Sequence, residues 1–165
     1  MEKLLANKMD LNIMPLCILE MVTKAIEINQ MYADKYHVKL KLVSTPKSTQ
    51  VFGDADRIQQ VCANLLSNAA KFSPTNGIVE IGINIKGRFA KVTITDQGEG
   101  IPEESRTKIF ERFFQADSSD TRINGGSGLG LAISKELIQR MNGNIGVTPN
   151  KQNGCSFFFE LPLAI

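Results

Sequence analysis

The chain has 165 residues, of which 42% are hydrophobic, and this length suits one folded domain with a single core. Its 19 basic and 17 acidic side chains leave a formal net charge of +2, too small to predict binding to nucleic acid or to an anionic membrane surface. No apolar run approaches the roughly 20 residues that a membrane span needs, and the N-terminus lacks a signal-peptide pattern. The composition therefore predicts a soluble domain.

The three cysteines, Cys17, Cys62 and Cys155, stand among apolar neighbours. They form no CxxC motif and no Cys/His spacing typical of a metal site, and an odd number cannot all pair with one another. Free cysteine is commonly buried in protein cores. We therefore predict reduced core residues rather than a metal or redox site.

Hydrophobic periodicity predicts four elements in the first half of the chain. Apolar residues at helical spacing over 15–36 predict a first helix, with Pro15 in its first turn. Apolar residues that alternate with lysines over 38–42 predict a strand with one solvent-facing side. A short strand at 51–52 and a second helix over 56–72 follow.

Two local signals mark the ends of helices. Asp54 can accept hydrogen bonds from the first N–H groups of the second helix, and Asn142–Gly143 is expected to end a third helix. The remaining predicted elements are a hairpin of strands 79–85 and 90–94 around a turn at 87–88, a helix over 129–141, and strands 145–148 and 155–161. Helices on one face of a largely antiparallel sheet make a two-layer α+β sandwich. The long irregular segment 97–127 is expected to be a lid.

Asn64, Asn68 and Lys71 share a polar stripe on the second predicted helix. Amide oxygens suit Mg²⁺, which takes its other ligands from water and phosphates, and a lysine is a movable charge for phosphate oxygens. On spacing alone, a solvated helix edge explains the stripe better. The functional interpretation needs support from other motifs.

Asp96 continues the inward-facing positions of the second hairpin strand, at the point where the sheet ends. A carboxylate there needs donors, and the amino group of adenine is a suitable one. Gly98 and Gly100 would let the backbone approach a flat ring without a Cβ in the way. An ordinary Asp-x-Gly turn explains these residues equally well.

Residues 125–130 form a glycine-rich turn before a helix, where free N–H groups and the helix dipole favour phosphate. The turn is neither a Rossmann fingerprint nor a P-loop, because no buried strand precedes it and no Gly-Lys-Ser/Thr occurs. Between the two glycine turns, the amphipathic segment 109–114 is accompanied by candidate phosphate contacts at Lys108, Arg112 and Arg122. A loop anchored by phenylalanines is an equally good explanation of this segment.

In combination, these motifs resemble the catalytic, ATP-binding domain of sensor histidine kinases, in the superfamily shared with DNA gyrase, Hsp90 and MutL. The similar segments, in the family's order, are the N box at 56–74, the first G box at 96–102, the F box at 109–114 and the second G box at 126–131. The sequence Asp-Ser-Ser-Asp-Thr-Arg at 117–122 resembles the lid of hybrid-type kinases most.

The resemblance implies a Bergerat fold, with a mixed, mainly antiparallel sheet covered on one face by helices and a long ATP lid. It implies that Asn68 holds Mg²⁺ with Asn64 nearby, that Lys71 meets phosphate, and that Asp96 binds the adenine amino group. The other residues that it places at the nucleotide are Gly98, Gly100, Ile101, Phe110, Gly126, Gly128, Leu129 and Gly130, with Arg112 and Arg122 as candidate catalytic cations beside Asn64 and Lys71. Some relatives have an arginine at the position of Gln115, so the cation that reaches the γ-phosphate stays open between Lys108, Arg112 and Arg122.

The resemblance also bears on the reaction. In the hydrolysing branches of the superfamily a glutamate activates water at the position of Asn64, and an asparagine cannot accept that proton. Slow hydrolysis and preferred transfer to a histidine on a separate helical domain are therefore implied. His37, at the start of a predicted strand, is interpreted as structural. Residues 1–11 resemble the end of the helical domain, so 12–165 would be the catalytic domain.

The implied partners are the protein's own dimerisation and phosphoacceptor domain and a response-regulator receiver domain, with no nucleic acid and no direct membrane contact. We expect a cytoplasmic, monomeric domain that binds ATP without phosphorylating itself; whether the parent protein is membrane-anchored stays open. Two alternatives remain at this point. A GHKL-type ATPase would use lid closure to drive conformational change, and a nucleotide-sensing pseudo-kinase would bind without transfer.

Overall fold

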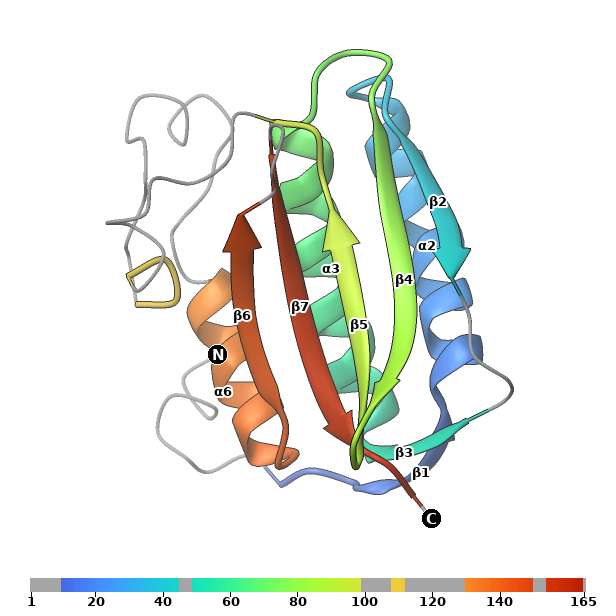
Figure 1. Cartoon of the computed structure of the whole chain (residues 1–165), viewed down its shortest axis with the longest axis vertical. Helices are drawn as coiled ribbons and strands as arrows, with labels where there is room; N and C mark the ends of the chain where they lie inside the picture. Colours follow the sequence, from blue (N-terminus) through green and yellow to red (C-terminus); the bar gives the residue numbers. More distant parts are fainter. Residues whose placement is uncertain (1–9, 45–48, 99–107, 112–129, 150–153, 165) are drawn as a thin grey trace.

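The computed structural model describes residues 10–44, 49–98, 108–111, 130–149 and 154–164. In these ranges the chain forms two layers, a five-stranded sheet and three helices on one of its faces (Figure 1). The helices are α2 (Ile18–Asp34), α3 (Ala55–Phe72) and α6 (Gly130–Arg140). The predicted two-layer α+β sandwich is confirmed.

The sheet has the strand order β2-β4-β5-β7-β6. Its strands are β2 (Lys39–Ser44), β4 (Ile78–Lys86), β5 (Phe89–Thr95), β6 (Asn144–Pro149) and β7 (Cys155–Pro162). β2 runs parallel to β4, and the other neighbours are antiparallel, so the sheet is mixed as expected. Gly87 adopts a φ of 61° in the tight turn between β4 and β5, a conformation that glycine reaches without strain.

The core lies between the helices and the inward-facing rows of the sheet. Ile81 of β4, Ile94 of β5 and Phe157 of β7 are neighbours across three strands, and all three are buried. Along each of these strands, every second side chain therefore points into the core, as the alternation predicts. Ile85, which the same alternation placed inside, is 44% exposed because it lies next to the turn, beyond the cover of the helices.

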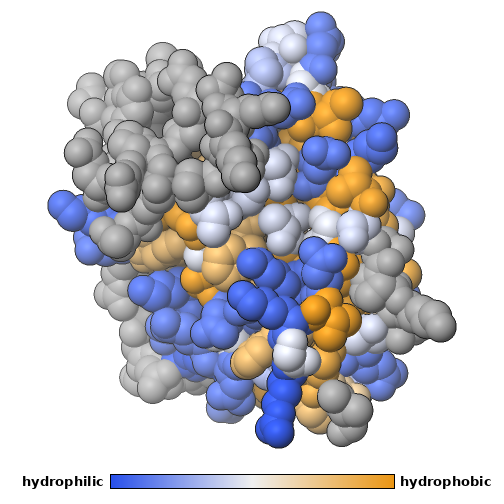
Figure 2. Space-filling model, viewed as in Figure 1, coloured by the Kyte–Doolittle hydropathy of each residue, from blue (hydrophilic) through white to orange (hydrophobic). Residues whose placement is uncertain are grey.

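The opposite face of the sheet carries no helix, and Figure 2 shows hydrophilic and hydrophobic side chains interspersed there. Phe158 lies on this face over Gly146 of the neighbouring strand, where a Cβ would approach the ring to 2.7 Å. The ammonium of Lys91 sits 4.3 Å from the centre of the same ring, in cation–π range. No helix in the described ranges has the length and apolar character of a bilayer-spanning segment.

The first predicted helix begins later than expected, and Pro15 does not lie in its first turn. Pro15 belongs to β1 (Met14–Cys17), which pairs antiparallel with β3 (Gln50–Gly53) in a small second sheet. Proline has no N–H, so it is tolerated in such a short edge strand as well as in a first helical turn. Pairing with β3 decides between the two, and α2 starts only at Ile18.

Two helices end in left-handed residues that are not glycine. His37 has a φ of 55° after α2, and Asn142 has a φ of 62° after α6. In both turns the N–H of the following residue donates to a carbonyl five residues back, from Val38 to Ala33 and from Gly143 to Ile138. This is the Schellman arrangement. The predicted helix end at Asn142–Gly143 is thus observed, and His37 occupies a turn that ends a helix.

Candidate functional site

Helix α3 positions the candidate site. Asp54 precedes it, and its carboxylate accepts from the N–H groups of Asp56 and Arg57, which confirms the predicted cap. The inward face from Ile58 to Ala70 is buried against the sheet and the other helices. Phe72, which helical spacing placed on that face, is 47% exposed because it is the last residue of the helix.

The polar stripe of α3 lies along the edge of this buried face. Asn64, Asn68 and Lys71 are all half-buried. The side chains of Asn68 and Lys71 make no hydrogen bond or ion pair with the described parts of the chain. A half-buried amide and ammonium without such partners are chemically able to take a ligand.

Asp96 follows β5 and is only 3% exposed, so the inward direction predicted from the strand alternation is observed. One carboxylate oxygen accepts from the N–H groups of Gly98, at 2.9 Å, and Cys155, at 3.3 Å. The other oxygen faces Sγ of Cys155 at 3.4 Å. Burial raises the pKa of Asp96, and the three donors oppose this rise without cancelling it.

Two glycines permit the close packing around Asp96. A Cβ on Gly98 would lie 2.2 Å from the carbonyl oxygen of Phe72, at the end of α3. A Cβ on Gly154, whose φ is 90°, would lie 2.2 Å from the carbonyl oxygen of Asp96. Real Cβ atoms do not approach backbone oxygens so closely, so both positions require glycine. The segment that carries Asp96 is thereby pressed against the C-terminal end of α3.

The start of α6 contacts the middle of α3. Nδ2 of Asn64 donates to the backbone oxygen of Gly130 and to Oγ of Ser134, each at 3.1 Å. One glycine from each predicted glycine turn thus packs against the same helix, Gly130 at Asn64 and Gly98 at Phe72, one residue beyond Lys71. Asn64, Asn68, Lys71, Asp96, Gly98 and Gly130 come together around one stretch of α3.

Phe110 lies within the short described segment 108–111. Its ring packs edge-to-face on Phe157 of β7, with 6.3 Å between the centroids, and the neighbouring Ile109 is buried. The interpretation of this segment as a loop anchored by phenylalanine is supported at Phe110. Lys108 is exposed. The other predicted site residues, Gly100, Ile101, Arg112, Arg122, Gly126, Gly128 and Leu129, lie outside the described residues.

Two residues at the site were not predicted from the sequence. Cys155 was interpreted as a reduced core cysteine, and it is buried as a thiol, yet it also donates to Asp96 through both its N–H and its thiol. Ser134 is completely buried on α6, where it binds Asn64. A serine within the apolar stripe of a helix is a weak signal, and its partner is 70 residues away in the sequence. Spacing alone could not identify that pair.

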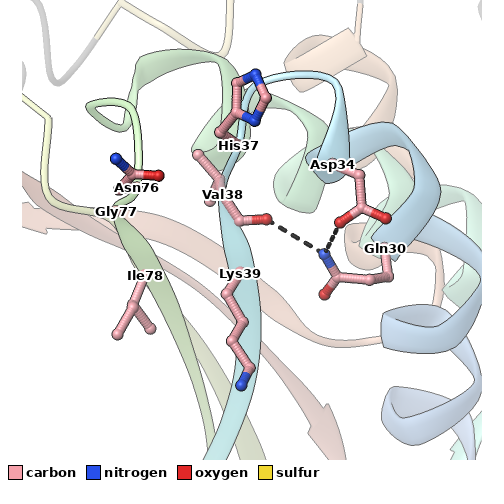
Figure 3. A pocket seen from close by; sticks show the side chains of 8 residues that line it. All are labelled: Gln30, Asp34, His37, Val38, Lys39, Asn76, Gly77 and Ile78. Atoms are coloured by element: carbon pink, nitrogen blue, oxygen red, sulfur yellow. Dashed lines mark hydrogen bonds between the residues drawn. The ribbon is translucent and has the colours of Figure 1, made fainter.

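A surface hollow of about 800 Å³ lies at the outer edge of the sheet, between the end of α2 and the starts of β2 and β4 (Figure 3). Its lining includes Asp34, His37 and Asn76 and none of the predicted site residues. The amide of Gln30 spans its floor, donating to Val38 O at 3.2 Å and accepting from Leu40 N at 3.1 Å. The Gln30 amide thus makes the hydrogen bonds that a neighbouring strand would otherwise make with this part of the chain. We therefore interpret the hollow as a result of helix packing at the sheet edge and not as a binding site.

Comparison with known families agrees with the geometry of the site. A family model described as "Histidine kinase-, DNA gyrase B-, and HSP90-like ATPase" matches residues 53–165. The sensor-like histidine kinase SenX3 of Mycobacterium tuberculosis is 35% identical over 144 residues, which are 87% of this chain and 35% of SenX3. The hybrid signal transduction histidine kinase K of Dictyostelium discoideum is 37% identical over 177 aligned residues, 99% of this chain and 14% of that protein. Hybrid and other sensor kinases match at similar identity, so the hybrid type is not specifically favoured.

Solved structures share the fold. The mycobacterial sensor histidine kinase MprB matches with a TM-score of 0.77 at 31% identity, over 91% of this chain and 97% of that one. Full-length ShkA in complex with AMPPNP matches with a TM-score of 0.83 at 28% identity, over 99% of this chain and 34% of ShkA. The histidine kinase ThkA in complex with the response regulator TrrA matches with a TM-score of 0.79 at 26% identity, over 98% of this chain and 45% of that one.

The present chain thus spans about a third of the length of SenX3 and a smaller share of the hybrid kinase. The family model covers more than half of the chain, from the end of β3 through β7. That region includes α3, Asp96 and the start of α6. The chain therefore belongs to the histidine kinase-, DNA gyrase B- and HSP90-like ATPase family, and it is a catalytic ATP-binding domain of the sensor histidine kinase type.

Proposed function

We propose that this domain transfers the γ-phosphoryl group of Mg-ATP to a histidine on a separate domain of its parent protein. The observation that carries the proposal is the packing of one glycine from each predicted turn on α3, Gly98 against Phe72 and Gly130 against Asn64. In this proposal the buried carboxylate of Asp96 and the polar side chains of Asn68 and Lys71 face one bound nucleotide. They offer an acceptor for a base and ligands for phosphates and their metal ion.

In this proposal each end of the nucleotide meets different chemistry. Asp96 accepts from the amino group of adenine, and Gly98 keeps the Asp96 segment packed against the end of α3. Asn68, with no partner among the described residues, supplies an amide oxygen for Mg²⁺, and Lys71 supplies a positive charge for phosphate oxygens. Bound Mg²⁺ would neutralise the charge that develops on the phosphates. The protein's own contribution is to position and neutralise, since phosphoryl transfer needs little covalent chemistry from the enzyme.

Transfer rather than hydrolysis fits the chemistry of Asn64. An amide has no basic lone pair at neutral pH, so Asn64 cannot activate a water molecule. Its nitrogen already donates to α6, which further ties this side chain to a positioning role. The domain would therefore hold ATP without rapid turnover until the phosphoacceptor histidine arrives.

The proposed partners follow from the relatives. ThkA was solved in complex with a response regulator and ShkA in complex with AMPPNP, and we extend both kinds of partner to this chain. We also propose that residues 1–11 continue a preceding phosphoacceptor domain, that the parent is a hybrid-type kinase, and that this domain works in the cytoplasm. Sequencing the parent gene on both sides of this segment tests the first two points, because a histidine-bearing helical hairpin and a receiver domain should flank it.

The enzymatic proposal is tested by joining the domain to such a hairpin and adding radiolabelled Mg-ATP. We expect acid-labile, base-stable label on the hairpin, lost in Asn68→Ala and strongly reduced in Lys71→Ala. Lys86→Ala is the control, because it removes a lysine at the C-terminal end of β4, away from Asn68 and Lys71. This variant should become labelled like the wild type. Tight ATP binding without any label would support the pseudo-kinase instead, and rapid phosphate release by the isolated domain would support the ATPase.

A further inference from the structure

The side chain of Asn64 joins two helices that lie far apart in the sequence. Its amide nitrogen donates to the backbone oxygen of Gly130 and to Oγ of Ser134, at 3.1 Å in each case. An amide NH₂ group has two hydrogens, and here both are directed to acceptors in the first turn of α6. Among the described contacts, only the carbonyl oxygen of Asn64 is left for a further ligand.

Ser134 has no exposed surface, although it lies on α6 among the buried residues Ile133, Leu137 and Ile138. A buried hydroxyl without a hydrogen bond costs free energy, so an alanine would be the simpler residue for packing at this position. The hydroxyl oxygen of Ser134 accepts a hydrogen bond from Nδ2 of Asn64. The serine therefore has a polar function on the side of α6 that faces α3.

Gly130 holds the same amide from another direction. A Cβ at this residue would lie 3.2 Å from Oδ1 of Asn64, which is tighter than ordinary contact, and 3.4 Å from its Cγ. Glycine thus lets the amide plane lie directly against the first turn of α6. The Gly130 carbonyl can accept from Asn64 in addition to its helical bond, because a carbonyl oxygen has two lone pairs.

We propose that Ser134 is a positioning residue of the nucleotide site. Its hydroxyl and the Gly130 carbonyl take both N–H groups of Asn64, which fixes the amide in the orientation that reserves its oxygen for a cation or water bound to the phosphates. The same bonds hold the start of α6 against α3. This inference rests on the proposed binding of Mg-ATP along the polar stripe of α3. Ser134 would orient the Asn64 amide of that stripe without itself touching the nucleotide.

The test compares the affinity for ATP by calorimetry in the presence of Mg²⁺ and in the presence of EDTA. Ser134→Ala should weaken binding of Mg-ATP by about 3- to 10-fold, the usual effect of losing one hydrogen bond, and should change the affinity in EDTA by less than about 2-fold. In an Asn64→Ala background the same substitution should have no further effect on Mg-ATP, because the two residues act as one unit.

Ser156→Ala is the matched control, since it also removes a buried hydroxyl, which is hydrogen-bonded to Oγ1 of Thr95 at 2.8 Å. It should leave the Mg²⁺ dependence of ATP binding unchanged. Ser134→Cys, which keeps a weak acceptor at the same place, should fall between wild type and Ser134→Ala. It also provides a second test if the alanine variant folds poorly.

Several results would overturn the assignment. A Ser134→Ala protein with wild-type affinity for Mg-ATP would do so, and so would an equal loss in EDTA or an additive loss on top of Asn64→Ala. These results leave the proposed function intact as long as the wild type binds ATP more tightly with Mg²⁺. A wild type whose ATP affinity does not depend on Mg²⁺ would contradict both proposals.

Discussion

Two buried aspartates of this domain each accept three hydrogen bonds from the described residues, and they lie at opposite ends of α3. Asp54 is 8% exposed and Asp96 is 3% exposed. In each, one carboxylate oxygen accepts from two backbone N–H groups, and the other oxygen has a single donor in the described part of the chain. Counting hydrogen bonds would therefore assign both residues the same role.

The difference lies in the single donor of the second oxygen. For Asp54 it is the N–H of Asn12 at 2.8 Å, and the first oxygen lies on the N-terminus of α3, where the helix dipole stabilises negative charge. For Asp96 it is the thiol of Cys155 at 3.4 Å, a weak donor. Asp54 is satisfied by the fold, whereas Asp96 keeps capacity for one stronger donor. A buried carboxylate is thus a candidate ligand group when its partners are weak, and a structural group when they are strong.

The largest effect is expected from Asp96→Asn. It should weaken ATP binding by about 10- to 100-fold, because a hydrogen bond to a charged acceptor becomes one to a neutral amide that can present its NH₂ to the base. The free energy of unfolding should not fall, since the substitution removes a buried charge. Calorimetry and urea unfolding measure the two quantities, and a variant that binds like wild type would remove Asp96 from the site.

Two glycine variants sharpen the comparison between site and scaffold. Gly154→Ala would place a Cβ 2.2 Å from the Asp96 carbonyl, and Gly143→Ala would place one 2.0 Å from the Glu160 carbonyl. Both should lower the free energy of unfolding, by about 1–3 kcal/mol from overpacking. Only Gly154→Ala should also weaken ATP binding in the fraction that remains folded. Equal affinities for the two variants would show that Asp96 tolerates displacement.

Asp54→Ala should produce the converse of Asp96→Asn. Loss of the helix cap is expected to lower the free energy of unfolding by about 1–2 kcal/mol, measured by urea titration. The affinity of the folded protein for ATP should stay within about 2-fold of wild type, because the described partners of this carboxylate are Asn12, Asp56 and Arg57 and none of the predicted site residues that the structure describes. A large loss of ATP affinity under conditions in which the variant is fully folded would mean that the two aspartates are not separable in function.

The smallest effect concerns pH. Burial raises the pKa of Asp96 above its ordinary value of 3.8, so the folded state holds this proton more tightly than the unfolded state. As pH rises from the ordinary value through the raised one, wild type should lose stability that Asp96→Asn, which cannot titrate, retains. The stabilities of the two proteins should therefore change with pH in parallel below the ordinary pKa of Asp96, and they should diverge between that value and the raised pKa. Parallel stability curves from urea unfolding across the acid range would contradict the assignment of the shift to Asp96.

Local patterns in the sequence were sufficient for much of this account. Period-two alternation placed Asp96 on the inner side of the sheet, and helical spacing placed Asn64, Asn68 and Lys71 on one stripe. Cap chemistry at Asp54 set the start of α3. These features depend on residues within a few positions of one another.

Features that depend on distant residues escaped prediction. The strand at Pro15 exists because β3, more than thirty residues later, pairs with it. The thiol of Cys155 reaches Asp96 across 59 positions, and Ser134 reaches Asn64 across 70. Nothing in the local pattern distinguishes these residues from ordinary core members. Their roles follow from tertiary packing alone.

The central claim is that Asp96 and Asn68 serve the two ends of one nucleotide. Calorimetric titration of the wild type, Asp96→Asn and Asn68→Ala with adenosine and with Mg-ATP tests it directly. The account predicts that Asp96→Asn weakens binding of both ligands, while Asn68→Ala weakens only Mg-ATP and leaves adenosine at wild-type affinity. If Asn68→Ala weakened adenosine as strongly as Mg-ATP, or if neither substitution changed either affinity, the claim would be wrong.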